Sequence, residues 1–391
     1  MATLPDLLKQ TVELSGSDLH LSIGSPPQVR VHGELQKLSH PELTPSDTKS
    51  LSYAVLTDAQ KKRFEEMLEL DFSFGIRGVA RFRCNMFNQK GAVGAVYRQI
   101  PEKIRTFEEL GLPMVLTKMA ERPRGLVLVT GPTGSGKSTT LAAMIDKINT
   151  ERHSHILTVE DPVEYVLPGI SQVQVNEKQG MTFAESLRAI LRQDPDVVLV
   201  GEIRDGETAR IASQAALTGH LVLSTLHTND ALGSLPRMLD LGVEASILAD
   251  ALLGVVSQRL IRRLCPACRQ PTKAPYFATD QEFQRLTGEY PAYHQVGCEA
   301  CDYTGFSGRL PIIESLEISP ALRQAIVTGE RRLEELTRIA AGNRRSMAAS
   351  AKEWIVSGET TPAEVQHTLG MRFWNELAHE HSAPQEPKKN A

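Results

Sequence analysis

A glycine-rich loop between two apolar segments constrains the fold of this chain more than any other feature. Gly131–Ser138 fits the pattern G-x-x-x-x-G-K-[ST]. The β-branched run 126–130 precedes the loop, and the helix-forming run 141–145 follows it. This order of strand, loop and helix predicts a phosphate-binding loop, because glycines allow backbone N–H groups and the positive end of the helix to converge on an anion. A glycine-rich turn without a ligand is the alternative.

We expect the ligand of this loop to be a nucleoside triphosphate, ATP, bound together with Mg²⁺. Lys137 would neutralise charge on the β- and γ-phosphates, and the hydroxyl of Ser138 would hold Mg²⁺. The residues of the loop expected to bind the nucleotide are Gly131, Pro132, Thr133, Gly134, Ser135, Gly136, Lys137, Ser138 and Thr139.

Composition limits the classes of partner and the compartment. The 391 residues, 41% of them hydrophobic, suffice for about two or three domains, and the net charge of −4 indicates no broad basic surface for nucleic acid or lipid. No apolar run reaches the roughly 18 residues of a membrane span, and residues 1–6 lack the layout of a signal peptide. We therefore expect a cytoplasmic protein whose five cysteines are reduced thiols or metal ligands.

The pattern along the chain predicts a mixed α/β protein with more than one domain. Residues 1–100 alternate short β-type runs with helical patches, which predicts a small α+β domain, and a polar linker containing a proline follows at 101–111. Beyond the linker, apolar runs alternate with helical patterns, which predicts a mostly parallel sheet covered by helices. The expected strands are 126–130, 155–159, 197–201 and 221–226.

The remainder of this second region, which we take as 112–378, has a C-terminal part expected to be mainly helical from about residue 230. Within it, the amphipathic run 246–256 is too short to span a membrane and lacks a basic face, so we expect a core helix there. Residues 379–391 are polar and contain prolines, and we expect a disordered tail.

Polar side chains lie at the ends of three of the expected strands, where an α/β sheet binds its ligands. Glu160 and Asp161 end one strand, Glu202 follows another, and His220 and His227 bracket the third. We expect Glu160 and Glu202 to position the attacking water, His227 to report the γ-phosphate, and Asp161 and His220 to contact the nucleotide. Taken alone, each carboxylate is also typical of a helix cap or turn, and each histidine of a hydrogen-bonded residue beside the core.

Four ordered motifs resemble the Walker A, Asp box, Walker B and His box of the secretion ATPases, the family that powers type II secretion and type IV pili. These motifs occupy 131–140, 160–162, 191–205 and 218–227. The resemblance covers roughly residues 15 to 370. It implies a PAS-like domain at 1–100, a RecA-like P-loop ATPase domain at 112–378 and a homohexameric ring.

The resemblance also implies a motor that drives pilus assembly or secretion through an inner-membrane platform protein, at the cytoplasmic face of that membrane. Members of the family use arginines of the first domain as fingers on the γ-phosphate, and Arg83 and Arg98 match their spacing. With Lys137, these arginines would complete the site as the domains close. Without the resemblance, arginines that face solvent from a strand are the simpler interpretation.

Two C-x-x-C pairs, Cys265 with Cys268 and Cys298 with Cys301, predict a Cys₄ zinc site that closes an insert at 262–308. Four thiolates leave no open position for a catalytic water, so the zinc would be structural. Unligated thiols or a redox pair are the alternatives. Cys84 has no partner in this pattern and is expected to be a small packed residue.

The direction of the motor is left open by the sequence. The cysteine insert resembles the assembly and export branch of the family, although the chain begins almost at the PAS-like domain, and residues 81–85 and 87–89 resemble the retraction branch. Two other classes of protein are alternatives to a motor: a RecA-like nucleic-acid-binding protein and a nucleotide-gated scaffold with negligible turnover of ATP. The acidic balance and the lack of an aromatic and basic stripe count against the first, so no nucleic acid is expected as partner.

Overall fold

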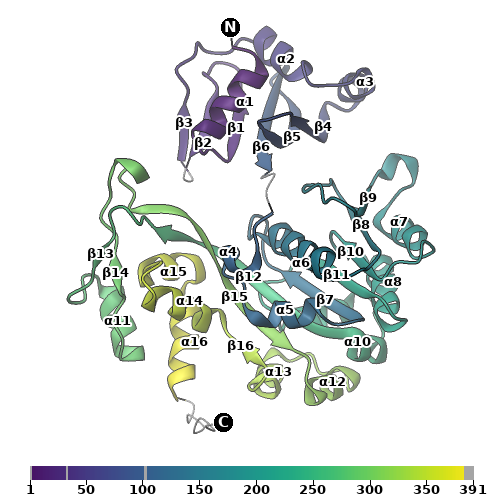
Figure 1. Cartoon of the computed structure of the whole chain (residues 1–391), viewed down its shortest axis with the longest axis vertical. Helices are drawn as coiled ribbons and strands as arrows, with labels where there is room; N and C mark the ends of the chain where they lie inside the picture. Colours follow the sequence, from purple (N-terminus) through teal and green to yellow (C-terminus); the bar gives the residue numbers. More distant parts are fainter. Residues whose placement is uncertain (1, 32–33, 101–103, 383–391) are drawn as a thin grey trace. The chain divides into compact units, whose positions relative to one another are not determined.

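The computed structural model describes residues 2–31, 34–100 and 104–382, which divide into two units. The first unit is the chain up to Ile104 together with Pro162–Val166, and the second is the rest. Figure 1 shows the N-terminal unit in purple to dark blue and the larger unit in blue through teal and green to yellow. Of the expected linker, residues 101–103 lie outside the described residues, and a short helix, α4 (Phe107–Leu110), occupies its end.

The N-terminal unit is an antiparallel sheet with three helices, and its strands follow the order β3-β2-β1-β6-β5-β4. Threonine capping boxes begin the helices, as at Thr3, where the hydroxyl accepts from the backbone of Asp6. The elements are α1 (Leu4–Glu13), β1 (Asp18–Leu21), β2 (Gln28–Val31), β3 (Glu34–Lys37), α2 (Pro45–Tyr53), α3 (Asp58–Met67), β4 (Glu69–Ile76), β5 (Ala80–Gln89) and β6 (Ala92–Ile100).

The second unit is built on a sheet whose strands follow the order β16-β15-β12-β7-β11-β10-β8-β9. The strands from β12 to β9 in this order are parallel, and β15 and β16 are antiparallel additions at one edge. The strands are β7 (Gly125–Thr130), β8 (Ile156–Glu160), β9 (Ser171–Gln174), β10 (Val197–Val200), β11 (Leu221–Leu226), β12 (Leu252–Leu264), β15 (Phe306–Glu317) and β16 (Arg344–Arg345).

Helices cover this sheet and complete the unit. They are α5 (Met114–Ala120), α6 (Lys137–Glu151), α7 (Phe183–Ile190), α8 (Gly206–Leu217), α9 (Ser234–Asp240), α10 (Ala245–Ala251), α11 (Ala278–Thr287), α12 (Pro320–Val327), α13 (Leu333–Ala340), α14 (Met347–Val356), α15 (Pro362–Leu369) and α16 (Met371–Ser382). A separate two-stranded ribbon, β13 (Gln270–Pro271) with β14 (Tyr293–His294), lies between the two cysteine pairs in the sequence.

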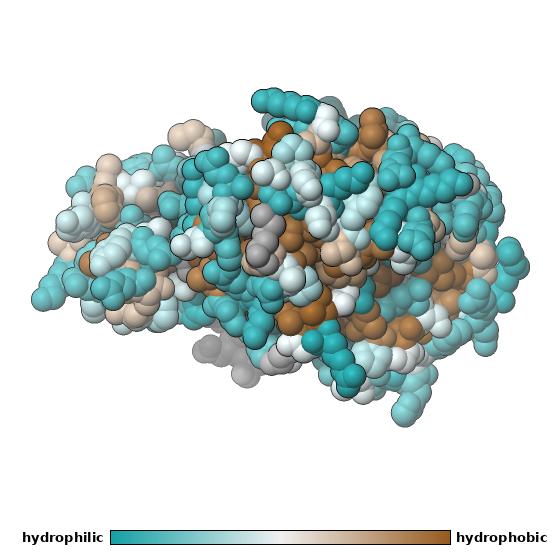
Figure 2. Space-filling model, turned by 90° about the horizontal axis from the view of Figure 1, so that it is seen from above, coloured by the Kyte–Doolittle hydropathy of each residue, from teal (hydrophilic) through white to brown (hydrophobic). Residues whose placement is uncertain are grey.

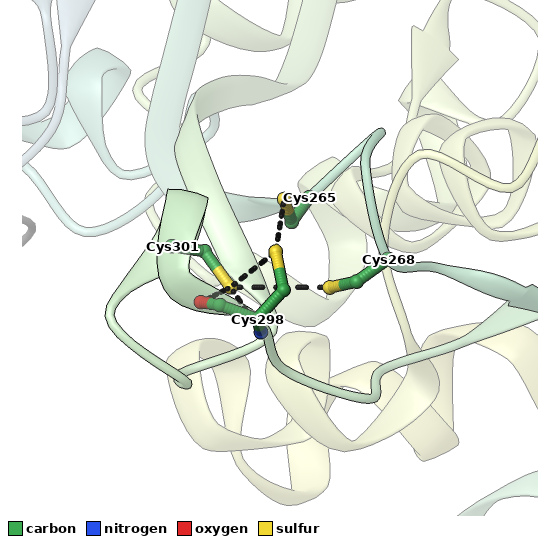
Figure 3. A group of neighbouring side chains, drawn as sticks. All are labelled: Cys265, Cys268, Cys298 and Cys301. Atoms are coloured by element: carbon green, nitrogen blue, oxygen red, sulfur yellow. Dashed lines mark hydrogen bonds between the residues drawn. The ribbon is translucent and has the colours of Figure 1, made fainter.

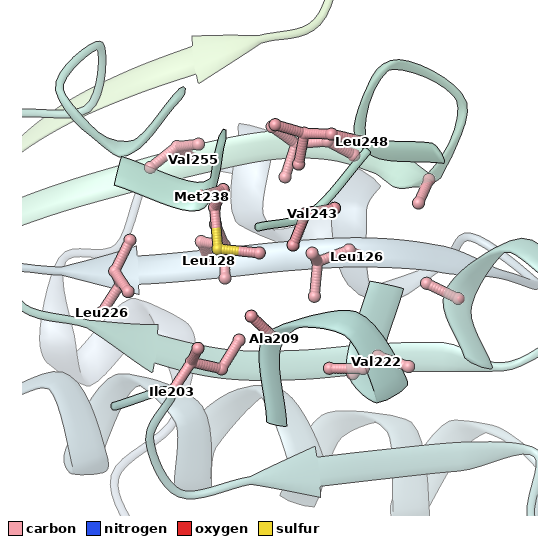
Figure 4. Close-up of a cluster of buried hydrophobic side chains, with 14 of the residues drawn as sticks. Leu126, Leu128, Ile203, Ala209, Val222, Leu226, Met238, Val243, Leu248 and Val255 are labelled. Carbon is pink, nitrogen blue, oxygen red and sulfur yellow. The ribbon is translucent and has the colours of Figure 1, made fainter. Parts of the chain in front are cut away.

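One large hydrophobic cluster of the second unit lies on one face of the sheet, as Figure 4 shows. Leu126 and Leu128 of β7 and Val222 of β11 are fully buried there against α8, whose Ala209 contributes only a methyl group and allows the helix to lie close. Burial of each such leucine or valine is worth about 1.5–3 kcal/mol. Because every residue of β7 and β11 is buried, the other face of these strands is covered as well.

The expected strands of the parallel sheet are confirmed, but the C-terminal part contains two long strands that the sequence pattern missed. The expected core helix at 246–256 is wrong beyond Ala251, where α10 ends and β12 begins. Gly254, which has no side chain, lets strand β12 lie close to β15 and to Met119. A Cβ there would lie 2.7 Å from the Leu316 carbonyl oxygen of β15 and 2.1 Å from Met119 Cε.

The start predicted for the disordered tail, residue 379, is also wrong. Helix α16 extends to Ser382 and so includes residues 379–382, while 383–391 lie outside the described residues. Among the helices of the described residues, none combines the length and the apolar character needed to cross a membrane. On the face seen in Figure 2, hydrophilic residues form most of the margin and hydrophobic residues show between them in patches.

Candidate nucleotide-binding and metal sites

The phosphate-binding loop joins the end of β7 to the start of α6, as the motif predicts. Gly131, Gly134 and Gly136 have φ of 136°, 79° and 88°, which other residues rarely adopt. At Gly131 a Cβ would also lie 2.5 Å from the Gln258 carbonyl oxygen. Helix α6 begins directly after the loop, so the positive end of its dipole lies where the loop would bind an anion.

Lys137 lies inside the curve of the loop. Its Nζ donates to the carbonyl oxygens of Gly131 at 2.9 Å and Pro132 at 3.0 Å, and the residue is only 9% exposed. Ser138 follows it in the first turn of α6 and is exposed, where its hydroxyl can reach a bound cation. The ammonium and the hydroxyl therefore lie where the motif requires them.

Gln258 of β12 forms hydrogen bonds with the phosphate-binding loop and with the helix that follows it. Sequence reasoning did not identify this residue. Its Nε2 donates to the Ser135 carbonyl oxygen at 2.5 Å, and its Oε1 accepts from the Thr140 hydroxyl at 2.9 Å. The side chain is 1% exposed. No local pattern marks Gln258, because it lies more than a hundred residues beyond the loop that it holds.

Glu160 and Glu202 lie at the same edge of the sheet as the phosphate-binding loop. Val200 of β10 pairs with Val159 of β8, so the residues that follow both strands lie side by side. A Cβ on Gly201 would lie 3.2 Å from the Val159 carbonyl oxygen and 3.4 Å from Glu160 Cα, which explains the glycine before Glu202. The structure therefore brings these two predicted carboxylates together.

Hydrogen bonds orient the Glu160 carboxylate. Its Oε1 accepts from the Thr158 hydroxyl at 2.6 Å and from Gln172 Nε2 of β9 at 3.0 Å. Asp161 follows Glu160 and is exposed at the same edge. A carboxylate held by two donors is a rigid acceptor, which suits the positioning of a water molecule.

Glu202 is 15% exposed and has a different partner at each carboxylate oxygen. Arg204 Nη2 donates to Oε1 at 2.6 Å, and His227 Nε2 lies 3.5 Å from Oε2. The hydrogen bond that Arg204 donates to Glu202 raises the pKa of Arg204, so the guanidinium stays charged. Arg204 belongs to the motif but received no role from the sequence; its position two residues after Glu202 is the signal that would have found it.

His220 is a correction to the expected nucleotide contacts. It precedes β11, where Leu221 pairs with Gly125 at the start of β7, whereas the phosphate-binding loop follows the other end of β7. A six-residue strand separates these edges by roughly 20 Å. The ring Nδ1 of His220 lies 2.9 Å from the Ala215 carbonyl oxygen, the role of a hydrogen-bonded residue beside the core. Only His227 of the pair lies at the edge with Glu202.

Arg83 of β5 and Arg98 of β6 are direct cross-strand partners in the N-terminal unit. Arg98 Nε donates to Asp18 Oδ1 at 2.8 Å, and the Asp18 side chain is 7% exposed. Arg83 Nη1 lies 3.3 Å from Glu164 Oε1 of the same unit. The two guanidinium groups thus share one region of the unit, and their contact with a nucleotide stays a prediction.

The four cysteines of the two C-x-x-C pairs form one cluster (Figure 3). Their Sγ atoms all lie within 4.8 Å of one another, with separations of 4.0 Å for Cys265–Cys298, 3.9 Å for Cys268–Cys301 and 3.8 Å for Cys298–Cys301. A tetrahedral zinc with Zn–S bonds of about 2.3 Å requires S···S separations of about 3.8 Å. The donor set therefore fits zinc.

Backbone N–H groups favour the thiolate at Cys301 of this cluster, whereas burial raises the pKa of Cys268, to about 12, and also raises that of Cys298. Gly297 N lies 3.3 Å from Cys268 Sγ, and the N–H groups of Cys298 and Gly305 donate to Cys301 Sγ at 3.2 and 3.3 Å. Although desolvation opposes the charge, these donors lower the pKa of Cys301 to about 7. Cys84 is buried in the N-terminal unit and has a raised pKa because of that burial, as a packed thiol should.

Comparisons with known proteins identify the family of the chain. A sequence profile for the family described as Type II/IV secretion system protein matches residues 8–370. The chain belongs to this family. The resemblance to secretion ATPases is therefore confirmed, and so is the mixed α/β fold class.

Two relatives are named for different systems, a type IV pilus and a type II secretion system. The chain is 48% identical over 271 residues to the "Type IV pilus retractation ATPase PilT" of Pseudomonas aeruginosa, an alignment covering 67% of this chain and 78% of the relative. It is 40% identical over 375 residues to "Type II secretion system protein E" of Aeromonas hydrophila, covering 92% of this chain and 73% of the relative. The chain spans about half the length of other relatives, such as 49% of the Dickeya dadantii type II secretion system protein E, to which it is 54% identical over 252 residues.

Two solved structures share the fold. The crystal structure of the pilus retraction motor PilT with bound ADP matches with a TM-score of 0.74 and 35% identity, covering 100% of this chain and 99% of that one. The Legionella pneumophila ATPase DotB matches with a TM-score of 0.69 over 96% of this chain and 95% of that one, and at 23% identity this likeness concerns the fold alone.

Proposed function

We propose that the chain is the ATP-hydrolysing motor of a type II secretion or type IV pilus system. The observation that carries the proposal is the approach of His227 Nε2 to Glu202 Oε2, 3.5 Å, at the sheet edge that also bears the phosphate-binding loop. A protein that only binds nucleotide needs the loop, whereas hydrolysis also needs a group that orients water and a group that responds to the γ-phosphate.

In the proposed mechanism, Lys137 and the N–H groups of the loop bind the β- and γ-phosphates, and Gln258 keeps the loop in shape. Mg²⁺, held through Ser138, would supply charge neutralisation on the phosphate oxygens. Glu202 and Glu160 position the attacking water, and His227 links the Glu202 carboxylate to the γ-phosphate.

Arg83 and Arg98 would supply positive charge at the γ-phosphate in the closed state. Their side chains are 38% and 60% exposed, so both guanidinium groups can exchange their present carboxylate partners for a phosphate. Such a step would make hydrolysis depend on the arrangement of the two units, which is what a motor requires.

Assembly and location are part of the same proposal. We place the chain in a homohexamer that acts on an inner-membrane platform protein from the cytoplasmic side of that membrane. The names of the relatives as secretion proteins and a pilus ATPase support this setting. Cys265, Cys268, Cys298 and Cys301 would hold a structural zinc, since their four sulfurs fill a tetrahedral shell.

The direction of action has two candidates. The main one is extension, in pilus assembly or in type II secretion, and the relatives named type II secretion system protein E favour it. The alternative is retraction, favoured by the likeness to PilT in sequence and in structure. Deletion of the gene in its host distinguishes them: loss of surface pili or of secreted protein indicates extension, whereas excess immobile pili indicate retraction.

The first prediction tests the chemistry through the purified protein with Mg²⁺ and ATP. We expect Glu202→Gln to bind a fluorescent ATP analogue as tightly as the wild type, because the loop is untouched. Phosphate release should fall by about 10²-fold or more, since the group that positions the water is lost. His155→Gln, which replaces an exposed histidine bonded to the Asp194 carbonyl oxygen, is the control.

Preserved turnover in Glu202→Gln would remove the role assigned to this carboxylate. Absence of phosphate release from the wild type, even in closed oligomers, would indicate a nucleotide-gated scaffold instead. A salt-dependent shift of labelled DNA or RNA at low protein concentration would favour the nucleic-acid-binding alternative.

A further inference from the structure

A buried network of four charged side chains lies in the C-terminal part of the second unit. Glu314 of β15 accepts from Arg344 Nε of β16 at 2.6 Å and from Arg372 Nη2 of α16 at 2.8 Å. Glu376 of α16 accepts from the same two arginines at 2.8 and 2.9 Å. The Glu314 side chain is fully buried, and those of the other three are 14–29% exposed. We call these four residues the ion-pair network.

Packing alone gives no reason for such a network. Removing four charges from water is unfavourable, and apolar side chains of similar volume could join β15, β16 and α16 at least as stably. The charges balance within the network, two of each sign, so no charge remains to be neutralised by a ligand. What distinguishes it is the set of backbone groups that it contacts.

These backbone groups belong to the loop that carries His227. We call residues 227–233 the His227 loop. Glu314 Oε2 accepts from the N–H of Ala231 at 3.3 Å, and Arg372 Nη1 donates to the carbonyl oxygen of Asn229 at 3.4 Å. Arg259 of β12 donates to the same carbonyl oxygen at 3.2 Å. Arg372 and Glu314, which form an ion pair with each other, thus both bond to backbone atoms within four residues of His227.

We infer that the ion-pair network positions the His227 loop for catalysis, with Arg372 and Glu314 as positioning residues. The inference rests on the proposed function, because it takes the approach of His227 to Glu202 as the arrangement used in hydrolysis. It makes helix α16, more than a hundred residues away in sequence, part of the support of the site. Any partner or nucleotide state that displaces α16 would then displace His227.

The test compares Arg372→Gln with a matched control, Arg262→Gln, in the full chain. Arg262 of β12 makes a similar pair with a buried glutamate, Glu364, with Nη2–Oε2 at 2.7 Å. Among the residues that the structure describes, its guanidinium bonds to Glu364 and not to the His227 loop. Backbone hydrogen exchange is followed in peptides covering 227–233 and 131–139, and kcat and KM for ATP are measured on the same samples.

We expect Arg372→Gln to speed exchange in the His227 loop and to leave the phosphate-binding loop unchanged. The kcat should fall roughly tenfold or more, while KM changes less than about twofold, because misplacement affects the transition state more than binding. Arg372→Lys, which keeps the charge, should restore part of both losses. Arg262→Gln should leave both readouts at the wild-type value.

Unchanged exchange in the His227 loop of Arg372→Gln would overturn the inference, and so would faster exchange with an unchanged kcat. If Arg262→Gln had equal effects, the effects of Arg372→Gln would reflect a general loss of stability, and this too would overturn the inference. If Arg372→Gln does not fold, Arg372→Lys carries the same comparison. A wild type without turnover would instead defeat the proposed function, while the exchange data would still decide whether the network holds the loop.

Discussion

The side chains at the candidate nucleotide site have two kinds of role. Some would take part in hydrolysis, and others hold those residues in position. Glu202 has Arg204 on one oxygen and His227 near the other, so the carboxylate has a defined orientation. Asp205, in the same motif, accepts from the Thr208 N–H at 2.8 Å and begins α8 as its N-cap. Two acidic residues of one motif, three positions apart, thus have unrelated tasks, and only the position of each on its element distinguishes them.

Gln258→Leu tests the residues that hold the site. The substitution keeps the volume but leaves the Thr140 hydroxyl and the Ser135 carbonyl oxygen without their buried partner. We expect the free energy of unfolding to fall by about 1–3 kcal/mol and the affinity for a fluorescent ADP analogue to fall with it. Gln324→Leu, on the exposed side of α12, is the control and should change neither. An unchanged affinity in Gln258→Leu would show that the loop keeps its shape without this tether.

At the scale of elements, β12 joins features that lie far apart in the sequence. It runs from Leu252, which pairs with Leu126 of β7, past Gln258 at the phosphate-binding loop, to Leu264, which directly precedes the cysteine cluster. Arg259 on the same strand reaches the His227 loop. A strand of this length therefore places the candidate zinc insert, the loop tether and a support of His227 on one rigid element.

Loss of the metal should affect this element before it affects the chemistry. We expect about one zinc ion per chain, measured by atomic absorption, and its absence in Cys265→Ser. The melting temperature should fall in that variant, while kcat measured well below the transition stays close to the wild type, because no step of hydrolysis uses the metal. Acidification should release the zinc, since protons compete for the thiolates.

Cys84→Ala is the matched control, because Cys84 lies in the other unit and outside the cluster. It should retain the zinc. An equal and immediate loss of stability and of turnover on chelation would contradict a purely structural metal.

The whole molecule consists of two units, and the proposed motor depends on their movement relative to each other. Arg98 is a poor probe of this movement, because its loss would also leave the nearly buried Asp18 without its ion-pair partner. Arg83 has a more exposed partner, Glu164 at 29% exposure, so its replacement disturbs the N-terminal unit less.

We therefore expect Arg83→Gln to keep its melting temperature and its affinity for ATP but to lose about 10³-fold in kcat, the contribution of an arginine finger. Arg77→Gln, at an exposed position of the same unit, should behave as the wild type. Turnover of Arg83→Gln within a few-fold of the wild type would exclude the finger role.

The sequence alone determined the parts of this protein that depend on neighbours along the chain. Gly131, Gly136 and Lys137 define the phosphate-binding loop because its strand, turn and helix are consecutive, and the two C-x-x-C spacings define a four-sulfur donor set for the same reason. Apolar runs located the parallel strands β7, β8, β10 and β11 but not β9 or β12. The carboxylates that follow β8 and β10 were expected at one sheet edge by the geometry of parallel strands alone.

Only the tertiary structure decided features that join distant segments. Composition does not distinguish the start of β12 from a continuation of α10, because the difference lies in the neighbours that close on Gly254. His220 and His227 look equivalent in sequence, yet the direction of β11 puts them at opposite edges of the sheet. The Gln258 tether and the Arg372–Glu314 pair connect segments more than fifty residues apart, and hydrogen bonds of that kind are set by folding rather than by any local pattern.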